Sequence, residues 1–128
     1  KVEDAKRLVT ETGIDLLSPA VGNLHGMLKN VPNTKLFTGR IAEIRQATGV
    51  PLVLHGGSGI TDADFVEAIQ AGISIIHINT ELRLAYRNAL REALQTEPDE
   101  VAPYQILKSA VQAMADVTKK RLQLFAQL

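Results

Sequence analysis

The sequence predicts an α/β fold with a parallel sheet, and three observations lead to this prediction. Apolar runs of strand length alternate with segments of helical periodicity along the 128 residues. The order is one helix, three strand–helix pairs and a final helix, which is typical of parallel strands joined by right-handed crossovers. Glycines follow three of the helical segments, where a left-handed residue commonly ends a helix: Gly13, Gly49 and Gly72.

The first predicted helix and strand lie at the beginning of the chain. Four residues recur at helical spacing before Gly13, namely Ala5, Leu8, Val9 and Thr12. Residues 14–21 form an apolar run that fits a buried strand, and Pro19 indicates that ladder pairing stops near its end. This strand leads into Gly22-Asn23-Leu24-His25-Gly26, and residues 29–35 are a polar loop.

The next helix, strand and helix repeat this order. A helix is expected before Gly49, and its apolar positions are Phe37, Ile41 and Ile44. A strand follows over residues 52–55. Thr61 is a good N-cap for the helix after it, because Asp62 and Asp64 then fall in the first turn.

The third predicted strand carries polar groups on one face. Residues 74–79 form a β-branched run in which Ile75, His77 and Asn79 share a face. Three strands cannot close a barrel, so the chain is either a small open α/β layer or the last part of a (β/α)8 TIM barrel. Because the chain opens on Lys1 and directly on a helical pattern, we expect it to be a piece of a longer protein.

Two longer helices are predicted after the third strand. The first covers residues 82–94, residues 96–103 form a polar break, and the last helix covers residues 104–125. The last helix contains the basic run Lys119-Lys120-Arg121, which is interpreted as a solvated face.

The balance of charge narrows the classes of function. Fourteen basic and fourteen acidic residues give zero formal net charge, so no global field favours nucleic acid or an anionic membrane as a partner. No apolar run is long enough to span a membrane. The absence of cysteine excludes disulfides, thiolate metal sites and cysteine nucleophiles, and it is compatible with a cytoplasmic location.

The most informative stretch is the loop after the second strand. The apolar residues 51–54 are followed by His55-Gly56-Gly57-Ser58-Gly59 and then by the helix that starts at Thr61. Backbone N–H groups of such a loop approach an anion closely, and a helix N-terminus adds partial positive charge, so the stretch predicts a phosphate site. The alternative is a glycine-rich turn that only reverses the chain.

Three histidines lie in or just beyond the three predicted strands: His25, His55 and His77. His25 and His55 are thirty positions apart, about the length of one βα repeat, so they should occupy equivalent places on neighbouring strands. Neutral imidazole is a good zinc ligand, so this pair is a candidate for shared metal ligation, although either residue could instead be a hydrogen-bonded structural group. For His77, a third ligand, a substrate contact and a polar residue of the barrel interior remain open.

Three segments together resemble the C-terminal half of the class II, zinc-dependent fructose-bisphosphate and tagatose-bisphosphate aldolase family. They are Gly22-Asn23-Leu24-His25-Gly26, His55-Gly56-Gly57-Ser58-Gly59 and Ile78-Asn79-Thr80-Glu81-Leu82-Arg83. The similarity extends from about Val2 to the last helix. It implies that residues 1–128 are the C-terminal portion of a single TIM-barrel domain, with about three βα units plus a C-terminal helix.

The resemblance assigns roles position by position. His25 and His55 match two of the family's three zinc-ligand histidines. The positions that match its binding site for dihydroxyacetone phosphate are Gly26, Gly56, Gly57 and Ser58. The positions that match its next phosphate and substrate contacts are His77, Ile78, Asn79 and Thr80.

The sequence departs from the family pattern in two respects. The first zinc histidine and the proton-transferring aspartate of the family lie in its N-terminal half, so no catalytic residue of that kind is expected in this chain. His77 also stands where the family usually has an asparagine that touches the reacting part of the substrate. This replacement affects either the choice of substrate or the rate.

The resemblance implies a lyase of carbohydrate metabolism, such as glycolysis. It would use zinc to cleave fructose 1,6-bisphosphate or a related ketose bisphosphate reversibly to dihydroxyacetone phosphate and an aldehyde, as a homo-oligomer (a dimer or tetramer). This chain alone would be inactive. One alternative is a non-catalytic sugar-phosphate-binding module that has lost the N-terminal catalytic groups. Another is a complete small α/β domain with a three-histidine metal site of its own.

Overall fold

The computed structural model describes residues 1–24, 26 and 35–126. The predicted metal ligand His25 therefore lies outside the described residues. The chain divides into two compact units, Lys1–Ile78 and Asn79–Leu128. Each unit is described by itself.

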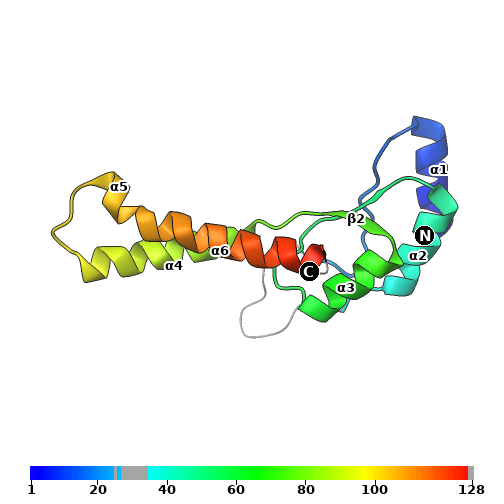
Figure 1. The fold of residues 1–128 in the computed structure, drawn as a ribbon. Helices are drawn as coiled ribbons and strands as arrows, with labels where there is room; N and C mark the ends of the chain where they lie inside the picture. Colours follow the sequence, from blue (N-terminus) through cyan, green and yellow to red (C-terminus); the bar gives the residue numbers. More distant parts are fainter. Residues whose placement is uncertain (25, 27–34, 127–128) are drawn as a thin grey trace. The chain divides into compact units, whose positions relative to one another are not determined.

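The first unit combines three helices with a parallel pair of strands (Figure 1). Its elements are α1 (Val2–Thr12), α2 (Thr38–Thr48), β1 (Leu52–Leu54), α3 (Asp62–Ala71) and β2 (Ile73–Ile76). β1 pairs with β2 in parallel, as the sequence predicts, and Leu54 lies opposite Ile76. The predicted glycine C-caps are confirmed, because Gly13, Gly49 and Gly72 all have left-handed backbone conformations.

The strand predicted over residues 14–21 is wrong. Only Leu17 pairs there, through one isolated parallel bridge to Leu52. The Leu17 N–H donates to the Pro51 carbonyl (3.1 Å), and the Val53 N–H donates to the Leu17 carbonyl (2.9 Å). The ladder cannot continue through Pro19, because proline has no N–H to donate. Parallel pairing thus stops after a single residue on this side of β1.

The strand predicted over residues 74–79 extends too far at its C-terminal end. β2 ends at Ile76, so His77 and Asn79 follow the strand instead of lying within it. His77 therefore stands directly after β2, as His55 stands directly after β1. The consequence is that both histidines belong to the loops at the carboxyl edge of the sheet.

The core of the first unit lies around β1. The largest fully buried side chains of the described residues are Phe65, Ile41, Leu52, Leu54 and Val21, and all belong to this unit. Leu52, Val53 and Leu54 are all buried, which is typical of a strand covered on both faces. This packing holds the end of β1, and hence the start of the loop that follows it, in a fixed place.

The second unit contains α4 (Thr80–Thr96), α5 (Pro103–Ile106) and α6 (Lys108–Phe125), with α4 and α6 packed side by side (Figure 1). The single helix predicted over residues 104–125 is broken at Leu107 into α5 and α6. Ala110 is its one fully buried hydrophobic residue among those described. No helix in the described part of the chain is both long and apolar enough to cross a bilayer.

Candidate functional site

The candidate site lies at the carboxyl edge of the β1–β2 pair. Leu54 and Ile76 are partners in the register, and each is followed at once by a histidine, His55 or His77. Strands in a parallel pair end at the same edge, so the register brings the two histidines to the same level. Both histidine residues are exposed. The sheet thus presents two imidazoles together at the edge where parallel α/β folds bind ligands.

Two backbone hydrogen bonds hold His77 in place, one to the end of β1 and one to the loop that follows β1. Its N–H donates to the Leu54 carbonyl (3.0 Å), and its carbonyl accepts from the Gly57 N–H (3.2 Å). A Cβ atom at Gly57 would lie 2.8 Å from Ile78 Cδ1 and 3.0 Å from the His77 carbonyl oxygen. A side chain at position 57 would therefore force Ile78 and the His77 carbonyl to shift. Because Gly57 has no side chain, its N–H can reach the His77 carbonyl and hold His77 in position.

A third segment reaches the same edge through Asn23. The Asn23 Nδ2 donates to the His55 carbonyl (2.8 Å), and Asn23 Oδ1 accepts from the Val21 N–H (2.9 Å). The Asn23 amide thereby links the chain after Leu17 to the loop after β1. Gly26, one of the predicted phosphate-binding positions, has a left-handed conformation with φ of 91°.

The two histidine side chains contact each other directly. His77 Nδ1 lies 3.2 Å from His55 Nε2, and the rings meet edge to face with centroids 4.4 Å apart. One of these nitrogens must carry a proton to donate while the other accepts. The contact places two ring nitrogens, which are potential metal ligands, side by side on exposed residues. Within the described ranges, no group of three or more histidine, aspartate or glutamate residues is placed to hold a metal ion.

The glycine-rich loop after His55 turns the chain into α3. Gly56 and Gly59 have φ of 67° and 88°, a region that favours glycine. Ser58 is buried, with 3% of its surface exposed. Gly57 is buried as well, and its N–H already donates to the His77 carbonyl (3.2 Å).

The start of α3 confirms the predicted N-cap. Thr61 Oγ1 accepts from the Asp64 N–H (3.1 Å) and donates to Asp64 Oδ2 (2.8 Å). Asp62 and Asp64 lie in the first turn, so their carboxylates already compensate the partial positive charge of the helix N-terminus. The N-terminus of α3 therefore keeps little uncompensated positive charge for an anion.

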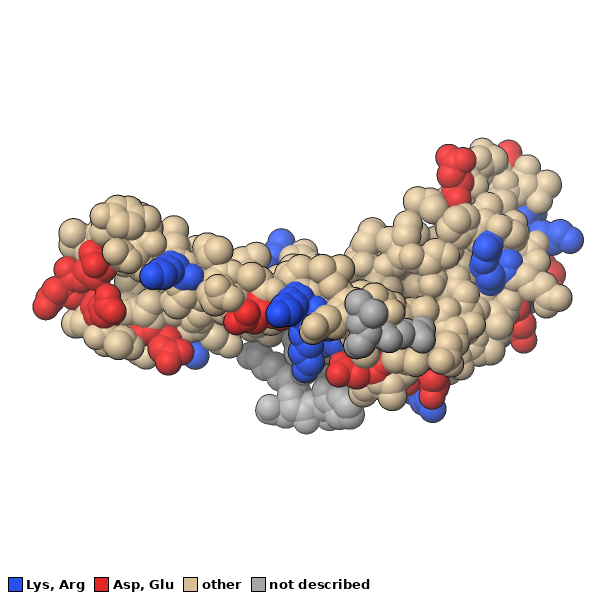
Figure 2. Space-filling view, viewed as in Figure 1, with Lys and Arg blue, Asp and Glu red and all other residues tan. Residues whose placement is uncertain are grey.

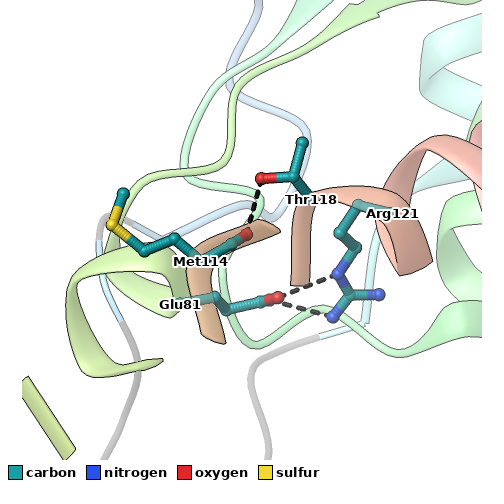
Figure 3. Close-up of polar contacts among 4 residues, drawn as sticks. All are labelled: Glu81, Met114, Thr118 and Arg121. Atoms are coloured by element: carbon teal, nitrogen blue, oxygen red, sulfur yellow. Dashed lines mark hydrogen bonds and ion pairs between the residues drawn. The ribbon is translucent and has the colours of Figure 1, made fainter. Parts of the chain in front are cut away.

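The remaining predicted contacts, Asn79 and Thr80, open the second unit. Asn79 is the N-cap residue of α4, and its carbonyl accepts from the Arg83 N–H (3.1 Å). Glu81, which follows Thr80, accepts two hydrogen bonds from Arg121 of α6 (Figure 3). Arg121 Nε lies 2.8 Å from Glu81 Oε2, and Arg121 Nη2 lies 3.0 Å from Glu81 Oε1.

Sequence reasoning missed this ion pair. The interpretation of Lys119-Lys120-Arg121 as a solvated face is wrong for Arg121, whose side chain is only 15% exposed, whereas Lys119 and Lys120 are exposed. The signal available was helical spacing: Arg121 stands four residues after Val117 and four before Phe125, both apolar. These three residues therefore fall along one face of the helix.

A groove of about 580 Å³ lies elsewhere in the second unit, beside α4, α5 and α6. Its acidic lining residues are Glu92, Glu97 and Glu100, with Lys108 as the basic one. Figure 2 shows acidic side chains gathered at the end of this unit where α4 leads toward α5. None of the predicted site residues lines this groove, so it is separate from the candidate site.

Comparison with known proteins identifies similar sequences along the whole chain. The profile of the family described as "Fructose-bisphosphate aldolase class-II" matches residues 1–127. A probable fructose-bisphosphate aldolase of Bacillus subtilis is 40% identical over 123 residues, 96% of this chain and 42% of the relative. A fructose-bisphosphate aldolase of Geobacillus stearothermophilus is 43% identical over 105 residues, 82% of this chain and 36% of the relative. The chain thus spans less than half the length of these relatives.

Solved structures show the same relationship. The YdjI aldolase of Escherichia coli K12 superposes with a TM-score of 0.78 at 32% identity, over 98% of this chain and 44% of that one. A fructose-bisphosphate aldolase of Campylobacter jejuni superposes with a TM-score of 0.78 at 18% identity, over 98% of this chain and 45% of that one, a likeness of fold alone. These neighbours are aldolases with a TIM-barrel-type fold, and this chain is a mixture of helix and sheet.

Proposed function

The chain belongs to the class II fructose-bisphosphate aldolase family, and we propose that it contributes the C-terminal part of an enzyme for reversible aldol cleavage. The substrate would be fructose 1,6-bisphosphate or a related ketose bisphosphate, and the products dihydroxyacetone phosphate and an aldehyde. In this proposal residues 1–128 form the last portion of a single (β/α)8 domain. The coverage of the relatives, 42% of the Bacillus subtilis protein, supports it.

The observation that carries the proposal is the meeting of His55, His77 and the glycine loop at one sheet edge. His77 Nδ1 lies 3.2 Å from His55 Nε2, and the Gly57 N–H binds the His77 carbonyl. The proposed metal donors and the proposed phosphate loop are thus within a few residues of each other. An aldolase needs this proximity, because the phosphate fixes one end of the substrate while the reaction occurs two carbons away.

Zinc is the metal we propose for this edge. The chemistry of the donors fits it, since two imidazole nitrogens are adjacent and exposed, and imidazole is a common zinc ligand. His55 would bind the metal together with His25, which the sequence places one βα repeat earlier. A bound zinc supplies a Lewis acid that polarises the substrate carbonyl.

The other residues of the chain would bind and orient the substrate. The loop residues Gly56, Gly57 and Ser58, together with Gly26, would hold the phosphate of dihydroxyacetone phosphate. The segment His77 to Thr80 would contact the next part of the substrate. Fixing the substrate in this way converts binding energy into orientation at the reacting carbons. Proton transfer would fall to an aspartate outside this chain, so we expect residues 1–128 alone to be inactive.

A second candidate is a sugar-phosphate-binding module without catalysis, and His77 is the observation that favours it. An imidazole at the position where the family usually has asparagine changes the group that meets the reacting part of the substrate. Under this hypothesis the metal and phosphate sites persist while cleavage is lost.

The test is an aldolase assay on the full-length protein with fructose and tagatose bisphosphates as substrates. We expect dihydroxyacetone phosphate to form, the rate to fall on treatment with a chelator, and zinc to restore it. His55→Asn should lower both zinc content and rate, while Thr10→Ala, on the exposed surface of α1, serves as the control. Phosphate binding without any cleavage of either substrate would favour the binding module instead.

We also propose that the full-length protein assembles as a dimer or tetramer in the cytoplasm, as its family membership suggests. Sedimentation equilibrium on the full-length protein measures the assembly. A monomer at micromolar concentration would contradict this part of the proposal.

A further inference from the structure

We propose that His77 is itself a metal ligand, binding through Nδ1 the same ion that His55 binds through Nε2. The inference rests on the proposed metal at His55 and goes beyond it, since the family pattern has asparagine rather than histidine at position 77. It gives this chain a nitrogen donor in addition to those that the resemblance assigns.

The separation of the two nitrogens is the first argument. His77 Nδ1 and His55 Nε2 lie 3.2 Å apart. Two nitrogens bound to one tetrahedral zinc at 2.0–2.1 Å stand about 3.3 Å from each other, as bond length and tetrahedral angle require. The separation of the two nitrogens therefore suits a shared ion, while the edge-to-face arrangement, with ring centroids 4.4 Å apart, requires the rings to turn until both in-plane lone pairs point at that ion.

The rigidity of the backbone around both histidines is the second argument. His77 is held on both sides, by its N–H to the Leu54 carbonyl (3.0 Å) and by its carbonyl to the Gly57 N–H (3.2 Å). His55 is held by the Asn23 side chain at its carbonyl (2.8 Å). Because the backbone of both residues is already held, binding an ion would order only their side-chain torsions, which lowers the entropy cost of a chelate.

The identity of the nitrogens also follows from the contact. His77 presents Nδ1 toward His55, which leaves its Nε2 as the N–H of the neutral ring when Nδ1 binds a metal. His55 presents Nε2 and keeps Nδ1 for the proton. Both histidine residues are exposed, so this edge of the sheet is accessible to an ion from solvent. The pair therefore meets the requirements of ligand type, separation and access.

The alternative role for His77 is a positioning residue. In that case its ring only hydrogen-bonds to His55, or to the substrate, and never touches the metal. The two roles differ in the number of imidazoles bound to the ion, which activity alone does not report. They also differ in the effect of an asparagine at position 77, because an amide can hydrogen-bond but is a poor zinc ligand.

The test is zinc-edge X-ray absorption, combined with zinc titration, on full-length wild-type, His77→Asn and His55→Asn proteins. We expect the imidazole count per zinc to fall by one in His77→Asn, and the dissociation constant for zinc to rise by more than about 100-fold, beyond the effect of losing an outer-shell partner. An unchanged imidazole count in His77→Asn overturns the inference. Zinc binding unaffected by His55→Asn would overturn the proposed metal site itself, which is a separate result.

A second measurement covers the case in which a variant misfolds. Nitrogen NMR of wild-type protein with labelled imidazoles, loaded with a spin-active cadmium isotope, reports scalar coupling between the ion and each ring nitrogen. Coupling to His77 Nδ1 supports the inference. Coupling to His55 Nε2 without any coupling to His77 overturns it and leaves the site at His55 intact.

Discussion

The ion pair between Glu81 and Arg121 should dominate the stability of the second unit. Replacing Arg121 with methionine removes two charge-assisted hydrogen bonds, of 2.8 and 3.0 Å, and leaves the Glu81 carboxylate without that cation (Figure 3). The two side chains are only 15% and 12% exposed, so water compensates the loss poorly. Breaking a fully buried pair costs about 3–5 kcal/mol, and the remaining exposure lowers our expectation to about 2–4 kcal/mol.

The pair also lies beside two of the predicted substrate contacts, Asn79 and Thr80, in the second unit. Glu81 lies in the first turn of α4, directly after Asn79 and Thr80, and α4 has no buried residue to anchor it. Arg121 is near the end of α6. Without the pair, the first turn of α4 should fray, and the proposed substrate contacts there should lose their fixed position.

Hydrogen exchange on the full-length protein measures this effect locally. In Arg121→Met we expect the amides of the second turn of α4, from Arg83 onward, to exchange about 30- to 1,000-fold faster, which is the free energy above expressed as a ratio. Replacing both residues, as Glu81→Met with Arg121→Met, should restore much of the protection, because an apolar pair carries no desolvation cost. Lys120→Met is the matched control, since Lys120 is exposed in the same turn. Equal exchange in Arg121→Met and Lys120→Met would refute the reasoning.

Two further substitutions test the loop after β1. Gly57→Ala should destabilise the full-length protein by about 1–3 kcal/mol in urea unfolding, because the new methyl would lie 3.0 Å from the His77 carbonyl and 2.8 Å from Ile78 Cδ1. Gly39→Ala, where nothing lies within 4 Å, should instead be neutral or stabilising, and equal losses at both positions would contradict the close approach. Thr61→Ala should cost about 1 kcal/mol through the lost N-cap bond to the Asp64 N–H. Thr10→Ala on α1 should change stability by less than about 0.5 kcal/mol, and a Thr61→Ala loss no larger than that would argue against the cap.

The sequence predicted local features well where one residue type determines the conformation. The glycine C-caps at Gly13, Gly49 and Gly72 and the N-cap at Thr61 are confirmed, because each depends on a backbone or side-chain property of that residue alone. The parallel pairing of β1 and β2 is confirmed as well. It follows from the order of strands and helices, which few topologies satisfy.

Strand ends and side-chain partners could not be predicted in the same way. The run over residues 14–21 is apolar enough for a strand, yet only Leu17 finds a partner, because pairing depends on the neighbour as well as on the sequence itself. Arg121 looked like part of a basic surface because its partner, Glu81, is forty positions away. Helical periodicity indicates which face of a helix a residue occupies, but it does not identify the charged residue that faces it from a neighbouring helix.

The position of His77 shows how a small error in a strand boundary changes a functional interpretation. Treated as part of a strand, His77 was open to roles as a ligand, a substrate contact or an interior polar residue. With β2 ending at Ile76, it becomes the counterpart of His55 at the same sheet edge, and the nitrogens of the two rings meet at 3.2 Å. If His55 binds a metal as proposed, the replacement of the family's usual asparagine lies where a second imidazole nitrogen is 3.2 Å from that ligand, so it would change the donor set of the site.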